Sequence, residues 1–132
     1  SMPEFARAAA ANGSDVVSMI NPIPAMAIDI ETRRPKIANI TGGLSGPAVK
    51  PVAVKMVYET ARAVDIPIIG MGGIFSGEDA VEFLLAGASA IAVGTAIFTD
   101  PLAPLKVLGG ISAYLERHGC KSVTEIIGQV RV

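Results

Sequence analysis

Two short apolar runs that end in glycines decide the fold class: Ile66–Gly73, which reads IPIIGMGG, and Ala90–Thr95, which reads AIAVGT. Each run has the length and the β-branched content of a buried strand, and Pro67 near the start of the first removes only one hydrogen-bond donor. A third run of this kind, Val16–Ile20, lies nearer the N-terminus. We therefore expect three strands that are apolar on both faces and covered on both sides.

Amphipathic stretches alternate with these strands. In Val49–Val64 the apolar residues recur at the i, i+3, i+4, i+7 spacing of a helix that packs on a sheet. Ser76 with Asp79 predicts a helix N-cap, and Gly87 predicts the end of that helix. The full set of predicted helical segments is Glu4–Ala11, Val49–Val64, Ser76–Gly87, Asp100–Gly119 with Pro101 at its first position, and a short turn over Ser122–Ile127. This order predicts an α/β fold of parallel βα units, in one domain spanning residues 1–132.

Residues 22–45 interrupt the alternation. They contain two alternating segments, Ile28–Glu31 and Lys36–Ile40, joined by the turn Thr32–Pro35. The pattern predicts a β-hairpin inserted above the end of the first strand. Long excursions of this kind are usually functional.

Composition excludes several functions. Eleven Lys+Arg against 12 Asp+Glu, for a formal charge of -1, argue against nucleic acid or an anionic membrane surface as the partner, and favour a small neutral or anionic ligand. The most apolar stretch, Ala86–Phe98, is shorter than the roughly 20 residues of a membrane span. The lone Cys120 and the lone His118 supply neither a zinc site nor a catalytic triad, so we expect no bound metal. A single cysteine also favours a reducing compartment, the cytoplasm.

The glycine loops predict a phosphate site. Glycines at the carboxyl end of a strand let backbone N–H groups approach a ligand closely, and in (β/α)8 barrels the phosphate site lies in the loops after the last two strands. The alternative is that these glycines only permit tight turns. A further glycine cluster, Gly42–Pro47, is expected at the same edge of the sheet, and its alternative explanation is that it only forms the entry to a helix. Asn21, directly after the first strand, is also expected there, and its alternative explanation is a simple Asn-Pro turn.

Together these segments resemble a known family. Asn39–Pro51 (NITGGLSGPAVKP), Met26–Asp29, Ile69–Ile74 and Val93–Ala96 are similar, in order, to the C-terminal half of class 1 dihydroorotate dehydrogenases, and most of all to the NAD-linked branch. The similarity runs from about Glu4 to Gly128. It implies the C-terminal part, about the last three strands, of a (β/α)8 (TIM) barrel that uses FMN to oxidise dihydroorotate to orotate in pyrimidine biosynthesis. It also implies an iron–sulfur flavoprotein as electron-transfer partner.

The resemblance assigns roles residue by residue. Ile20 and Gly46 would touch the flavin, while Gly72, Gly73, Gly94 and Thr95 would hold the FMN phosphate. Asn21 would hydrogen-bond the pyrimidine, and Pro22 stands where the family usually has a hydroxyl residue that helps to bind orotate. Ala25 stands where the family has a glycine.

Length is the larger departure from the family. A (β/α)8 barrel takes about 250 residues, and the family's catalytic cysteine and flavin-side lysine belong to the N-terminal half. We therefore expect no catalytic residue in this chain and no turnover by it alone. The alternatives are a non-catalytic, self-associating half-barrel, or a phosphate-ligand-binding domain of another barrel family. Unpaired sheet edges predict a homo-oligomer in either case.

Overall fold

Three parallel strands form the centre of the fold, in the order β1 (Val17–Met19), β6 (Ile68–Met71), β7 (Ala90–Ala92). The computed structural model describes all 132 residues. Met19 pairs with Gly70, and Met71 pairs with Ala92, so the three strands end close together at one edge of the sheet. The α/β prediction with parallel βα units is confirmed.

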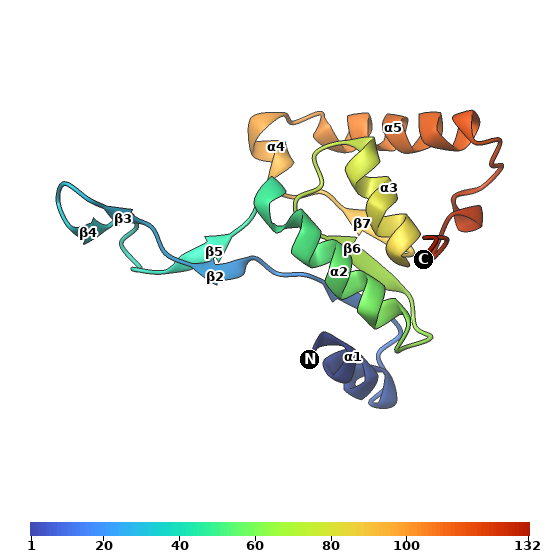
Figure 1. Cartoon of the computed structure of the whole chain (residues 1–132), viewed down its shortest axis with the longest axis horizontal. Helices are drawn as coiled ribbons and strands as arrows, with labels where there is room; N and C mark the ends of the chain where they lie inside the picture. The colour runs from blue at the N-terminus through green and yellow to red at the C-terminus, as the bar shows by residue number, and fades with distance from the viewer.

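Helices cover one face of this sheet (Figure 1). α2 (Lys50–Ala61), which continues η1 (Pro47–Val49), and α3 (Gly77–Ala86) pack on the strands. α1 (Met2–Ala11) packs on α2, and α5 (Ala103–Arg117) packs on α3. The remaining helical segments are α4 (Ala96–Thr99) and η2 (Val123–Glu125). The core lies between helices and strands, where Ile68, Val57 and Phe83 are fully buried. A Cβ on Gly70 would lie 2.7 Å from Phe83 Cδ1, so glycine lets α3 approach β6 closely.

The other face of the sheet has no helix layer, and the expectation of strands covered on both sides is wrong for this chain. Along β6, Ile68 and Gly70 are buried, whereas Ile69 and Met71, which point to the opposite face, are only half-buried. In a barrel this second face points inward, where it is filled by the side chains of neighbouring strands.

The C-terminal helix begins later than predicted. The predicted helix start at Asp100 and Pro101 is wrong: α4 forms first, and α5 begins at Ala103. The Asp100 carboxylate accepts a hydrogen bond from the Leu102 N–H at 3.0 Å, so it orders the turn between the two helices. The capping boxes of α3 and η2, at Ser76 and Ser122, follow the sequence prediction.

The insertion projects away from the helical layer (Figure 1) and contains two antiparallel ladders. β2 (Ile23–Ala25) pairs with β5 (Gly42–Leu44) at its base, and β3 (Ile28–Asp29) pairs with β4 (Arg34–Pro35) at its tip. The predicted second strand at Lys36–Ile40 is wrong. The turn lies at residues 30–33, two residues earlier than predicted. It forms there because Asp29 accepts hydrogen bonds from the N–H groups of Glu31 and Thr32.

None of the helices combines the length and the apolarity that crossing a lipid bilayer requires.

Two glycines set the distance between α3 and α5. A Cβ added to Gly110 would lie 2.7 Å from Gly77 Cα, and one added to Gly77 would lie 2.4 Å from Gly110 Cα. Since both clashes are with backbone, the helices would have to move apart. Gly109, the next residue on α5, has nothing within 4 Å of an added Cβ.

We expect Gly110→Ala to lower the free energy of unfolding by about 1–3 kcal/mol through overpacking. The matched control Gly109→Ala should raise it by about 0.5–1 kcal/mol, since alanine favours an exposed helical position. Urea unfolding followed by circular dichroism measures both variants. Equal effects of the two substitutions would contradict the close helix contact.

Candidate functional site

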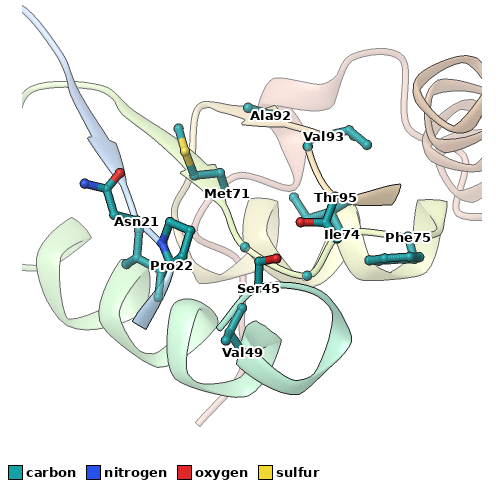
Figure 2. Close-up of a pocket in the computed structure, with 14 residues that line it drawn as sticks. Asn21, Pro22, Ser45, Val49, Met71, Ile74, Phe75, Ala92, Val93 and Thr95 are labelled. Atoms are coloured by element: carbon teal, nitrogen blue, oxygen red, sulfur yellow. The ribbon is translucent and has the colours of Figure 1, made fainter. Parts of the chain in front are cut away.

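A pocket of about 170 Å³ lies where the three parallel strands end (Figure 2). Its walls come from the segments that follow β1, β6 and β7, together with the entry to α2. The lining residues are Ile20, Asn21, Pro22, Ser45, Val49, Met71, Gly72, Gly73, Ile74, Phe75, Ala92, Val93, Gly94 and Thr95.

The structure brings the sequence-predicted residues together. Of the predicted cofactor-binding set, Ile20, Gly72, Gly73, Gly94 and Thr95 line the pocket, and so do both predicted substrate-binding residues, Asn21 and Pro22. The eighth, Gly46, is buried directly behind the lining: a Cβ on Gly73 would meet the Gly46 carbonyl oxygen at 2.6 Å. The individual roles of these residues stay predictions.

Four residues that line the pocket have backbone N–H groups without a partner in the chain. The N–H groups of Gly72, Gly73, Gly94 and Thr95 donate to no backbone acceptor, and no side chain accepts from them. Gly73 is a buried residue, and buried N–H groups are almost always paired in folded proteins. The unpaired N–H of Gly73 therefore points to an acceptor that the chain itself does not supply, while Gly94 is exposed and Gly72 and Thr95 are half-buried, so their N–H groups are open to solvent or to a ligand.

The backbone conformation of the loop after β6 requires glycine. Gly72 and Gly73 have φ angles of 126° and 77°, in a region that side chains rarely adopt. A Cβ on Gly73 would also lie 2.9 Å from Lys50 Cβ. The positive φ angles and the close approach to Lys50 both require glycine. Since glycine has no side chain, the peptide groups themselves form this part of the pocket wall.

Two hydroxyl groups complete the polar part of the site. Figure 2 shows the Ser45 and Thr95 side chains directed toward one another beside the glycine loop, with Asn21 at the opposite side of the pocket. The Thr95 hydroxyl does not cap α4, so it is free for a ligand. Sequence reasoning missed Ser45 as a site residue, although its place between Gly43 and Gly46 at a helix entry was a usable signal. The apolar lining residues were also missed, because apolar side chains carry no chemical signature; they are Val49, Met71, Ile74, Phe75, Ala92 and Val93.

No ionisable side chain lines the pocket. The nearest charged cluster lies behind the loop, where Lys50 Nζ is 2.6 Å from Asp79 Oδ1 and 2.5 Å from Glu82 Oε1. Burial favours a raised pKa for Asp79, but hydrogen bonds from Lys50 and from the Phe75 and Ser76 N–H groups outweigh it, and the net pKa is lowered. The same bonds to Asp79 and Glu82 raise the pKa of Lys50.

The remaining singled-out residues lie outside the pocket. His118 ends α5, where its ring Nδ1 lies 2.9 Å from the Tyr114 carbonyl oxygen. Cys120 follows that helix and is a free thiol. Arg33, Arg34 and Lys36 are exposed at the hairpin tip. No group of three His, Cys, Asp or Glu side chains is placed to hold a metal ion.

The pocket wall thus combines peptide N–H groups, two hydroxyls and one amide with apolar side chains, and it contains no ionisable group. Fold and site thus define a segment of a parallel α/β barrel with a ligand pocket at the carboxyl ends of its strands.

Comparison with known proteins gives the family. Residues 1–115 match the family model described as dihydroorotate dehydrogenase. The chain is 61% identical over 129 residues to the catalytic subunit of dihydroorotate dehydrogenase B (NAD(+)) of Bacteroides fragilis, covering 98% of this chain and 43% of that protein. It is 58% identical over 126 residues to the corresponding subunit of Alkaliphilus metalliredigens, covering 96% of this chain and 42% of that protein.

A solved structure agrees. The dihydroorotate dehydrogenase of Eimeria tenella, crystallised in complex with ferulenol, superposes with a TM-score of 0.79 at 29% identity, covering 97% of this chain and 34% of that one. The chain belongs to the dihydroorotate dehydrogenase family, and it spans less than half the length of the curated relatives it matches. The predicted family and the partial-barrel fold are confirmed.

We expect Asp79→Asn to lower the free energy of unfolding by about 1–3 kcal/mol at pH 6, because a half-buried carboxylate loses its charge-assisted bonds. The folded-state pKa of Asp79 is lowered, so its contribution is complete above the unfolded pKa of about 4 and is lost as the pH falls through the folded value. The difference between the two proteins should therefore shrink below about pH 4.

Urea unfolding from pH 7 down to pH 3 makes this measurement. Glu59→Gln is the control, since Glu59 forms an exposed i, i+4 pair with Lys55. A difference between Asp79→Asn and the parent that stays constant over this pH range would contradict the assignment of Asp79.

Proposed function

We propose that the pocket holds the phosphate of FMN, within an enzyme that oxidises dihydroorotate to orotate in pyrimidine biosynthesis. The observation that carries the proposal is the set of unpaired N–H groups at Gly72, Gly73, Gly94 and Thr95, in a chain of this family. Backbone donors at the carboxyl ends of adjacent parallel strands suit a phosphate, because they supply several hydrogen bonds to one anion without a side-chain charge.

The residues present fit the phosphate end of the cofactor. Ser45 and Thr95 add hydroxyl donors beside the loop, and the N–H of buried Gly73 gains the acceptor that it lacks. The pocket of about 170 Å³ is smaller than the roughly 300 Å³ at which ligand sites begin. This supports a division in which the chain holds one end of the cofactor and other barrel strands complete the site.

When bound, FMN supplies the electron acceptor for oxidation of the substrate. The chain contributes binding and orientation: we propose that Ile20, in the pocket wall, and Gly46, directly behind it, contact the flavin. Asn21 presents an exposed amide with two donors and one acceptor, which suits the ring of a pyrimidine. Pro22 cannot donate a hydrogen bond, so we propose that Asn21 carries substrate recognition on this strand.

Proton removal from the substrate needs a base, and no lining side chain supplies one. The relatives are more than twice as long as this chain, and we propose that the base and the remaining strands come from the part of the barrel that it does not span. Since the relatives are described as catalytic subunits, we propose a second subunit as partner. An iron–sulfur flavoprotein as that partner and a cytoplasmic location are what the family resemblance and the single cysteine imply, and they complete the proposal.

We expect the purified chain to bind FMN, detected by its visible absorption and quenched fluorescence, at least about 10-fold more tightly than riboflavin, which lacks the phosphate. Thr95→Val should weaken FMN binding and leave riboflavin binding unchanged. The chain alone should not reduce a dye with dihydroorotate. Equal affinity for FMN and riboflavin would overturn the phosphate site, and turnover would overturn the absence of a base.

Exposed apolar surface favours one further property, self-association. Phe98 is 91% exposed, and Leu102, Leu105 and Leu108, which recur at helical spacing, form an exposed stripe. A cavity of about 380 Å³ between β7 and α5, lined mainly by apolar residues, adjoins that stripe. The outer edges of β1 and β7 have no strand partner. In a complete barrel further strands and helices cover these surfaces.

We expect the isolated chain to form dimers or larger assemblies, because uncovered strand edges and apolar stripes associate. Size-exclusion chromatography with light scattering measures the mass directly. Leu105→Lys should shift the distribution toward the monomer, and Lys121→Gln, at an exposed position after α5, is the control. A monodisperse parent monomer would contradict this expectation.

A further inference from the structure

Lys50 connects the two loops that form the polar end of the pocket. It is the first residue of α2, directly after the Gly42–Val49 segment that carries Ser45 and Gly46. Its ammonium group reaches α3, where it bonds Asp79 at 2.6 Å and Glu82 at 2.5 Å. Only 22% of the Lys50 side chain and 18% of that of Asp79 are exposed, so this pair is largely removed from solvent screening.

Asp79 continues the connection to the glycine loop. While its Oδ1 accepts from Lys50, its Oδ2 accepts from the N–H groups of Phe75 and Ser76, at 2.9 and 3.0 Å. Phe75 is itself a pocket-lining residue, two positions after Gly73. One carboxylate thus joins the lysine to the end of the Gly72–Ser76 loop.

The backbone makes a second contact between the same two segments. Gly73 packs against the first turn of α2, and a Cβ there would lie 3.0 Å from the Lys50 backbone nitrogen. The Lys50 backbone therefore lies directly beside the loop, and the Lys50 side chain is joined to the loop through Asp79. Since Lys50 does not line the pocket and its charge faces two carboxylates, it is not placed to bind an anion directly.

We infer that Lys50 and Asp79 are positioning residues for phosphate binding: they fix the Gly72–Ser76 loop against the entry of α2, so that its unpaired N–H groups converge on one anion. The inference rests on the proposed function. A preorganised loop pays no ordering entropy when the ligand binds, and supporting residues behind a binding site commonly affect affinity without touching the ligand. Glu82, half-exposed, is the outer partner and is not required.

The test compares FMN and riboflavin binding by Lys50→Met and the parent chain, by fluorescence titration. We expect FMN affinity to fall about 10-fold, with riboflavin affinity unchanged, because only the phosphate contacts depend on the loop. Amide hydrogen exchange at Phe75 and Ser76 should accelerate in the same variant. Lys50→Arg should restore both properties, since it can bond Asp79.

Two controls separate this role from general effects of charge. Lys55→Met removes an exposed lysine from the same helix, and Glu82→Gln removes only the outer carboxylate. Both should bind FMN as the parent does.

The outcomes distinguish the inference from the function on which it rests. If the parent prefers FMN and Lys50→Met keeps that preference, the inference is overturned and the proposed function stands. If Lys50→Met loses FMN and riboflavin equally, Lys50 is merely structural, and the inference is overturned. If the parent does not prefer FMN, the phosphate site and its positioning fail together.

Discussion

The parallel pairing of β6 with β1 on one side and β7 on the other is the constraint on which the site depends. Carboxyl ends of parallel strands meet at one edge of a sheet, so three segments far apart in sequence converge there. Gly70 on β6 allows α3 to pack close behind, and the Gly77–Gly110 contact brings α5 against α3. The helices thus fix the strand positions, and the strand ends fix the pocket.

The proposed phosphate binding depends on peptide groups rather than on side-chain charge. The pocket has no lysine or arginine in its wall, and the nearby Lys50 is engaged by Asp79 and Glu82. Peptide N–H groups are effective ligands only when the backbone holds them in place, because each is a weak donor without a full charge. This explains why a rigid glycine loop and a half-buried ion pair occur side by side.

Regular periodicity made most of the fold predictable. The strands at β1, β6 and β7, the helices α2 and α3, and the capping boxes at Ser76 and Ser122 follow from local pattern. The errors in element boundaries lie where side-chain hydrogen bonds to the backbone compete with the regular strand or helix pattern. Asp29 closes the hairpin turn earlier than alternation suggests, and Asp100 orders a turn that separates α4 from α5. The expectation that both faces of the sheet are covered was also wrong, because the hydrophobicity of a strand does not show which elements of the same chain pack on it.

The sequence by itself determined the α/β class, the glycine loops after β6 and β7, and the family, because strand runs and ordered motifs are properties of local sequence. It also placed Ile20, Asn21, Gly73 and Thr95 in one candidate site. Only the tertiary structure decided that these residues share a pocket and that Ser45 and Met71 belong to it. It also decided that Lys50 on α2 bonds Asp79 on α3. The reason is physical: pairing of N–H groups, cavity volume and ion pairs between distant residues depend on packing distances, which local sequence patterns do not specify.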